Sequence, residues 1–400
     1  FRSSRRCGTS ETRMGVRAVL VTLVVTLVGL WLGQDGSVWA QQAVGQPQTF
    51  TATARVVEVL EEGVTTVGPV TQPYQRLLVE LTSGPEKGQR VEVSVGVRDL
   101  NTAGQRFAPG DRLFLTVSTG PDGSRAYTIL DRDRSTPLAV LAVLFAGAIV
   151  ALGRWKGVRA LLGLAFTFVV LIWVLVPLIL RGYPPVPVAI AVSFVVFVVT
   201  LTVTHGVGRM VLAAMAGTSL SLILTGLLAA LFVAAAGLTG LADEEASFLQ
   251  VVLGERAVSP RGLLLAGMLV GALGVLDDIT VSQSSLVFEL RRANPSLTGW
   301  ELFAAGVRVG RDHIAATVNT LVLAYAGAAL PLLLLFSQLE EPLLWILNRE
   351  IVAQEVVQTL VGSLGLIAAV PLTTGFAAWL AVRTPVTALE PSPHHHGHVH

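Results

Sequence analysis

Apolar and polar positions follow two different patterns along this chain of 400 residues. Between residues 50 and 131, short runs such as Arg90–Val95 alternate polar and apolar side chains, which is the period of a half-buried strand. From Pro137 to Val382, apolar runs repeatedly approach the length of about 20 residues that a membrane-spanning helix needs. The pattern therefore predicts a small β domain followed by a polytopic helical membrane domain.

Five strand-like runs, separated by turn sequences rich in glycine, proline and aspartate, make up the predicted β domain at residues 50–131. The runs are Thr51–Leu60, Gln75–Leu81, Arg90–Val95, Arg112–Val117 and Arg125–Leu130. Five short strands predict a small OB-like β-barrel. Because the runs carry no aromatic platform and no cluster of basic residues at alternate positions, we interpret this domain as a structural or partner-binding cap.

Seven apolar segments at residues 137–382 are candidate transmembrane helices. They are Pro137–Gly153, Ala160–Leu180, Val186–Val203, Met210–Gly237, Gly262–Leu276, His313–Phe336 and Val357–Val382. The fifth segment is short for a spanning helix, so we expect it to continue past Asp277. The predicted fold class is a polytopic α-helical membrane protein of about seven transmembrane helices, preceded by a small extracytoplasmic β-barrel.

The segment at residues 14–40 has the pattern of an export signal. Arg17 precedes an apolar stretch, Ala18–Leu32, and Ala40 supplies the small residue of a cleavage site. A cleaved signal peptide and an uncleaved signal anchor both fit this pattern, and either would export the β domain. Residues 1–13 precede Met14 and are interpreted as an upstream extension.

Composition excludes several classes of protein. Hydrophobic residues make up 52% of the chain and charged residues 14%, against about 25% charged in soluble domains, and the mean hydropathy is +0.67. The net charge of +1, without a basic stripe, predicts no nucleic-acid partner. The single cysteine, Cys7, precedes Met14, which leaves no cysteine chemistry. Motifs for nucleotide binding and hydrolysis are absent, so no nucleotide, cofactor or catalytic residue is predicted.

Charged residues in the loops predict the orientation of the chain, because cytoplasmic loops carry an excess of Lys and Arg. Cations follow the first, third, fifth and seventh segments, whereas acidic clusters at Asp243–Glu245 and Glu340–Glu341 follow the fourth and sixth. We therefore expect an extracytoplasmic β domain and a cytoplasmic C-terminus. The tail at residues 383–400 holds five of the seven histidines, which is typical of a metal-binding tail, a disordered tail or a cloning remnant.

Polar side chains line one face of the fourth segment and gather in the sixth. In the fourth segment Thr218, Ser221 and Thr225 share a helical face, which fits either close helix packing or the lining of a polar path. The polar residues of the sixth segment are Asp312, His313, Thr317, Asn319 and Thr320. An amide within a span is costly unless it faces protein or water, so function and packing are both open for this group.

The fourth and sixth segments also resemble each other. Gly208-Arg209 and Gly310-Arg311 begin short matching stretches that end at Thr218 and Thr320, with a constant offset of 310 − 208 = 102. We expect these two helices to be parallel and adjacent, with the two threonines at similar depth. Asn319 and Thr320, opposite Thr218 and Ser221, would then form the polar centre of the molecule.

Ionisable residues form a belt near the predicted cytoplasmic ends of the spans. Its members are His205, Asp277, Asp278, Asp312 and His313. They fit a divalent-cation site or a proton relay, for which His205, Asp278 and His313 are the metal candidates, or simply a solvated inner rim. Asp278 and Ser282 continue along one face of the predicted fifth helix, so we place them beside Asp277 on the candidate substrate path.

Several segments together resemble the YibE/F-like bacterial membrane proteins over roughly Phe50 to Val382. They are Asp131–Pro137, Met215–Leu220, Gly274–Ser285, Gly310–Asp312 and Asn319–Gly327. The family usually has a single aspartate where this chain has Asp277 and Asp278, so the resemblance leaves open which of the two is equivalent. The resemblance implies no established activity.

Together with the resemblance, these observations favour a permease-like protein of the bacterial inner membrane that moves a small solute or ion along a polar path between transmembrane helices. The alternative is a scaffold that does not transport, with the β domain docking a partner, and a membrane-embedded enzyme is the third interpretation. The expected partners are the lipid bilayer and either further copies of this chain or a second membrane protein. No cofactor is predicted.

Overall fold

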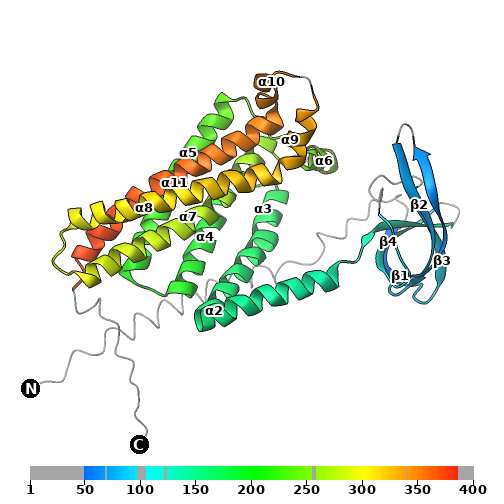
Figure 1. The fold of residues 1–400 in the computed structure, drawn as a ribbon, viewed down its shortest axis with the longest axis horizontal. Coiled ribbons are helices and arrows are strands. Elements are labelled where there is room, and N and C mark those ends of the chain that lie inside the picture. The colour runs from blue at the N-terminus through cyan, green and yellow to red at the C-terminus, as the bar shows by residue number, and fades with distance from the viewer. Residues whose placement is uncertain are drawn as a thin grey trace, which may run out of the picture. The chain divides into compact units, whose positions relative to one another are not determined.

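The computed structural model describes residues 49–67, 70–96, 105–120, 124–254, 258–339 and 341–385. The chain divides into two compact units at Ala148 and Ile149, so that the boundary falls inside a helix. The first unit contains an antiparallel sheet and the start of that helix, and the second contains the remaining helices (Figure 1).

Five antiparallel strands form one sheet in the order β3-β2-β1-β4-β5. The strands are β1 Thr49–Val67, β2 Val70–Leu81, β3 Arg90–Val95, β4 Arg112–Thr119 and β5 Arg125–Arg132. Register shifts after Val56 and Val59 mark irregularities in the long first strand, which pairs with β2 on one side and β4 on the other. The five predicted strands are confirmed; the third has the predicted bounds, and the other four extend further than expected.

The core of the sheet comes from the alternating pattern seen in the sequence. Leu77, Val79, Leu113 and Leu115 are fully buried in one apolar cluster, to which all five strands contribute. The buried Gln75 amide accepts from the Phe107 backbone N–H at 2.8 Å and donates to its carbonyl at 3.2 Å. The Gln75 side chain therefore satisfies both backbone groups of Phe107, as a neighbouring strand would, and holds the connection between β3 and β4 against the sheet.

A short run of charges joins β5 to the first helix, α2 (Ser135–Val170). Asp131 accepts from the Arg134 guanidinium and from the Arg132 backbone N–H, both at 2.7 Å. Asp133 accepts from the Ser135 backbone N–H at 2.9 Å and so satisfies a free donor at the start of α2. The hydrogen bond from Arg134 is the main cause that lowers the pKa of the Asp131 carboxyl to about 2.

This junction predicts a specific loss of stability in acid. Because the pKa of Asp131 falls from 3.8 to about 2 on folding, its stabilising effect is complete above pH 3.8 and disappears as the pH falls toward 2. Asp131→Asn should lower the melting temperature at pH 6 and flatten its dependence on pH between 5 and 2. The measurement is thermal unfolding of the full-length protein, followed by the circular dichroism of the sheet. The matched control is Glu58→Gln at an exposed position of β1; an equal effect there would contradict the prediction.

Helices account for the rest of the described chain. After α2 come η3 Leu171–Leu175, α3 Val176–Leu180, α4 Pro185–His205, α5 Arg209–Ala235, α6 Glu244–Leu253, α7 Pro260–Ala293, α8 Gly299–Ala328, α9 Leu330–Ser337, α10 Leu343–Leu347 and α11 Glu350–Val382. Within the described residues, five helical stretches are long and apolar enough to cross a membrane. A sixth results if α8 and α9, which are bent by 62° relative to each other, count as one span.

Seven separate spanning helices were predicted, and the described residues contain five, or six with the bent pair. The first two predicted segments lie in one stretch of 46 residues, Ser135–Leu180, which is broken at Arg154 with φ 50° and ψ −128°. The break brings the chain close to itself, because a Cβ on Gly157 would lie 2.3 Å from the Ile149 carbonyl oxygen. The expectation that the fifth segment continues past Asp277 is confirmed, since α7 runs on to Ala293.

Helix α11 packs against α5, α7 and α8, and α7 packs against α4 and α5 (Figure 1). Glycines allow these close approaches. A Cβ on Gly217 of α5 would lie 2.0 Å from Thr373 Oγ1, and one on Gly310 of α8 would lie 2.5 Å from Val370 Cγ1. Further along the helices, Gly365 meets Thr225, so α5 and α11 are antiparallel.

Helix α8 is also antiparallel to α11, because Gly310 lies opposite Val370 and Leu321 opposite Gly362. Helices α5 and α8 are therefore parallel, as expected. They pack against α7 and α11 rather than against each other in the described structure. Thr218 lies near the level of Thr373 and Thr320 near that of Gly362, which are about 16 Å apart along α11. The expectation of adjacent helices with these threonines at similar depth is wrong.

Candidate functional site

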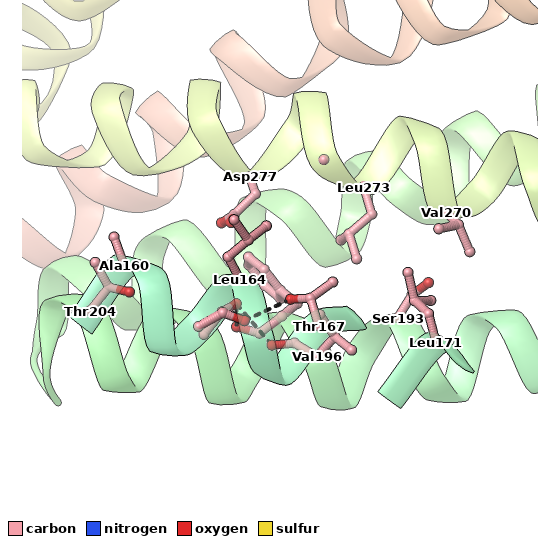
Figure 2. A pocket seen from close by; sticks show the side chains of 14 residues that line it. Ala160, Leu164, Thr167, Leu171, Ser193, Val196, Thr204, Val270, Leu273 and Asp277 are labelled. Atoms are coloured by element: carbon pink, nitrogen blue, oxygen red, sulfur yellow. Dashed lines mark hydrogen bonds between the residues drawn. The ribbon is translucent and has the colours of Figure 1, made fainter. Parts of the chain in front are cut away.

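A cavity of about 290 Å³ lies between α2, η3, α4 and α7 in the helical unit (Figure 2). Its walls are mostly apolar, and the polar atoms come from one carboxylate and four hydroxyl side chains. The polar lining residues are Thr167, Ser193, Thr200, Thr204 and Asp277. Asp277 is therefore the single ionisable side chain in the lining of this cavity.

Asp277 projects from the middle of α7 toward Leu164 and the helices on the other side of the cavity (Figure 2). Its Oδ1 atom is buried and has no hydrogen-bond partner in the described structure. The adjacent Asp278 is exposed, because neighbouring residues point about 100° apart on a helix. The sequence placed both aspartates on the candidate path, but in the structure only Asp277 lines the cavity.

The hydroxyl groups of the lining differ in their hydrogen bonds. Thr167 donates to the Gly163 carbonyl at 2.9 Å, and Thr200 donates to the Val196 carbonyl at 2.8 Å, so both protons are held by their own helices. Ser193 is only 2% exposed, and its Oγ atom has no partner in the described structure. Buried polar atoms are nearly always paired, so unpaired oxygens on Ser193 and Asp277 mark this cavity as unusual.

Glycines help to shape the chamber. A Cβ on Gly163 of α2 would lie 3.6 Å from Thr200 Cγ2 of α4, so these two helices are in close contact at that point. A Cβ on Gly274 of α7 would meet nothing within 4 Å, which shows open space one turn before Asp277. Helix α7 itself is fixed at its start, where the Ser259 hydroxyl accepts from the Gly262 backbone N–H at 3.1 Å.

The polar face of α5 belongs to the packed core. Thr218, Ser221 and Thr225 are buried, and none of them lines the cavity. The Thr218 and Thr280 hydroxyls are 2.5 Å apart between α5 and α7, while Ser221 and Thr225 donate to carbonyls of their own helix. Of the two interpretations offered by the sequence, close helix packing accounts for these contacts.

The polar residues of α8 lie on its outer side. Asp312, His313, Asn319 and Thr320 are exposed and Thr317 is half-buried. The expectation that Asn319 faces the interior is wrong. Gly306 and Gly310 fix the face of α8 that packs against α7 and α11, and Asn319 follows Gly310 by nine residues, or about two and a half turns. It therefore points away from the bundle, and no polar centre forms with Thr218 and Ser221.

The remaining candidates are dispersed. His205, Asp278 and Ser282 are exposed, like His313, and within the described ranges no three His, Cys, Asp or Glu side chains come together as metal ligands. The histidines at positions 394–400 and the predicted signal segment lie outside the described residues. Of the ionisable residues in the predicted belt, only Asp277 lines the cavity.

The sequence analysis missed the hydroxyl residues of the cavity, although a signal was present. Ser193 and Thr200 in the third predicted segment, and Thr204 directly after it, are spaced at i, i+7 and i+11, which places them on one helical face. Thr218, Ser221 and Thr225 likewise share one helical face in the fourth segment, where the face packs against other helices. The pattern identifies a polar face but does not say what that face meets.

Several apolar helices of membrane-spanning length, some of which enclose a cavity lined by a half-buried carboxylate, define this chain as a multi-pass membrane protein. It belongs to the YibE/F-like family: the family model described as YibE/F-like protein matches residues 141–383. The matched residues include every lining residue of the cavity. Comparison with curated proteins and with solved structures gives no match.

Proposed function

We propose that the helical domain is a permease for a small solute, with the Asp277 cavity as its binding point. The observation that carries this proposal is the buried, unpaired carboxylate oxygen of Asp277 in a chamber between candidate spans. Ionisable groups within spans are costly and commonly line substrate paths. The path proposed here runs beside α2, α4 and α7, and of the residues that the sequence suggested only Asp277 is retained.

The proposed arrangement in the membrane has seven crossings. A continuous helix of 46 residues would be about 69 Å long, more than twice the about 30 Å of a hydrocarbon core. We therefore divide Ser135–Leu180 at the break in Arg154 and count the bent pair α8–α9 as one crossing. The antiparallel packing of α5 and α8 against α11 agrees with regular alternation.

Sidedness follows from the positive end of the bundle. Arg209 at the start of α5 donates to the Arg383 carbonyl at 2.8 Å, so the start of α5 and the end of α11 share one end. We assign this end to the cytoplasm of a bacterium, which places the β domain outside. The strand order, with β3 close to β5, supports an OB-like barrel there. Reporter fusions after Gly123 and after Arg383 should report opposite compartments; the same compartment for both would refute this assignment.

The permease is tested in proteoliposomes that hold the purified full-length protein, with a panel of labelled cations, anions, sugars and amino acids. Asp277→Asn should reduce uptake of the transported compound at least tenfold, because it removes the only charge in the cavity. Asp278→Asn is the matched control and should retain uptake, since that side chain is exposed. Melting temperatures of both variants should stay close to that of the wild type.

Equal loss of uptake in both variants would contradict the assignment of the site to Asp277. Failure of the wild-type protein to move any compound of the panel would refute the permease and favour the alternative, an assembly protein. One observation favours that alternative: the Asn319 amide is exposed on α8. Lipid cannot satisfy the hydrogen bonds of this amide, whereas a helix of a second protein could. Further copies of this chain or another membrane protein would supply such a helix.

A further inference from the structure

The polar side chains of the Asp277 cavity offer mainly hydrogen-bond acceptors. Thr167 and Thr200 donate their protons to backbone carbonyls, so their oxygens can offer only lone pairs to the chamber. Asp277 adds an unpaired carboxylate oxygen, and Ser193 adds a buried hydroxyl without a partner. None of the 14 lining residues is Lys, Arg, His, Asn or Gln. Ser193 and Thr204 are therefore the only side chains of the lining with a proton available to donate.

This chemistry selects the sign of the ligand. An anion would meet the Asp277 carboxylate and the lone pairs of the threonine oxygens, and it would find almost no donors. A cation would find a carboxylate to balance its charge, in a cavity whose other polar side-chain atoms are neutral oxygens, the kind of ligand that hard cations prefer. An apolar environment strengthens that attraction, because charges interact more strongly where water is scarce.

The number of charges limits the valence of the cation. Calcium sites use six to eight oxygens and usually several carboxylates, and magnesium is usually bound by one or two carboxylates together with substrate phosphates and several waters. The cavity has one carboxylate, and within the described residues no three acidic or histidine side chains gather as a ligand set. One carboxylate balances one positive charge. A volume of about 290 Å³ also leaves room for water around a small ion.

We propose that the Asp277 cavity binds a monovalent cation of the alkali-metal type. Asp277 supplies the balancing charge, and the hydroxyl oxygens of Ser193 and Thr200 line the same chamber. This inference rests on the proposed function, since it names the class of solute that the same site would take. It differs from the simpler state in which Asp277 is a neutral carboxylic acid beside trapped water.

The test measures binding without transport, on the full-length protein purified in detergent. Melting temperature is recorded with increasing LiCl, NaCl or KCl, while choline chloride keeps the ionic strength constant. We expect a saturable rise with at least one alkali ion, because a ligand that binds only the folded state stabilises it. Asp277→Asn should abolish the rise. Asp277→Glu, which keeps the charge, and the control Asp278→Asn should retain the rise.

Each other outcome overturns the inference. Equal melting temperatures in choline chloride and in every alkali chloride at the same ionic strength would show that no alkali ion binds, and a rise that persists in Asp277→Asn would place the ion elsewhere. A protein that no alkali ion stabilises would fit a neutral Asp277. A stronger saturable effect of MgCl₂ or CaCl₂ would replace the monovalent assignment.

The two proposals can fail separately. Alkali stabilisation that depends on Asp277, combined with no uptake in vesicles, would refute the permease and keep the cation site. Uptake of an anion or a neutral solute that depends on Asp277, without any alkali stabilisation, would refute the cation site and keep the permease.

Discussion

Gly217→Val is expected to destabilise the helical domain by about 3 kcal/mol, at the upper end of the usual cost of overpacking. The Cβ atom alone would lie 2.0 Å from Thr373 Oγ1 and 2.9 Å from Thr373 Cα. Rotation of the threonine side chain cannot relieve the contact with the backbone, and Thr373 is fully buried. Helices α5 and α11 would have to move apart. The measurements are the melting temperature in detergent and the amount of folded protein in the membrane.

The control for this prediction is Gly267→Val on α7. That glycine is exposed and a Cβ there would meet nothing within 4 Å, so the substitution has the same intrinsic effect on a helix without the collision. A second site offers a rescue. Gly365→Ala would collide with Thr225 Oγ1 at 2.0 Å, and adding Thr225→Ala would leave only the Cβ contact at 3.1 Å. Equal effects of Gly217→Val and Gly267→Val would show that the close approach does not hold the bundle together.

Strands and apolar helices could be predicted from the sequence because each depends on a local pattern. The alternation in Arg90–Val95 indicates a strand with one buried face, and this indication does not depend on which strand lies beside it. The predicted and observed bounds of this strand agree. The continuation of α7 past Asp277 was predicted from length alone. The break at Arg154 was not predicted, since it depends on a backbone conformation that the apolar pattern does not contain.

The site was harder to predict because it depends on which helix faces meet. A stripe of hydroxyls on α5 and another on α4 look alike in sequence, but Thr218 meets Thr280 whereas Ser193 lines a cavity. Asn319 was misplaced because the glycines of α8, nine residues or more away, decide which face turns inward. Asp277 was among the candidates, and only packing distinguished it from Asp278.

Gln283 of α7 joins three helices, and its removal is expected to cost about 3 kcal/mol. Its amide donates to the Gly306 carbonyl of α8 at 2.7 Å and to Thr374 Oγ1 of α11 at 2.8 Å, and the residue is 4% exposed. Gln283→Ala would remove both hydrogen bonds and leave a cavity beside Gly306 and Gly310, whose missing side chains make room for the amide.

Gln283→Met, with Gln358→Met as its control, separates the part of this free energy that comes from hydrogen bonding from the part that comes from packing. Gln283→Met keeps a long unbranched side chain and removes only the hydrogen bonds, so we expect a loss of about 1 kcal/mol, in the range measured for interhelical bonds in membranes. Gln358→Met is the matched control, because the Gln358 amide is half-buried and donates a single bond, to Tyr325 Oη at 2.9 Å. Its cost should be smaller than that of Gln283→Met in the same thermal or denaturant unfolding measurement. If Gln283→Met were as costly as Gln283→Ala, hydrogen bonding and not packing would dominate at this junction, contrary to the steric role that Gly306 and Gly310 indicate.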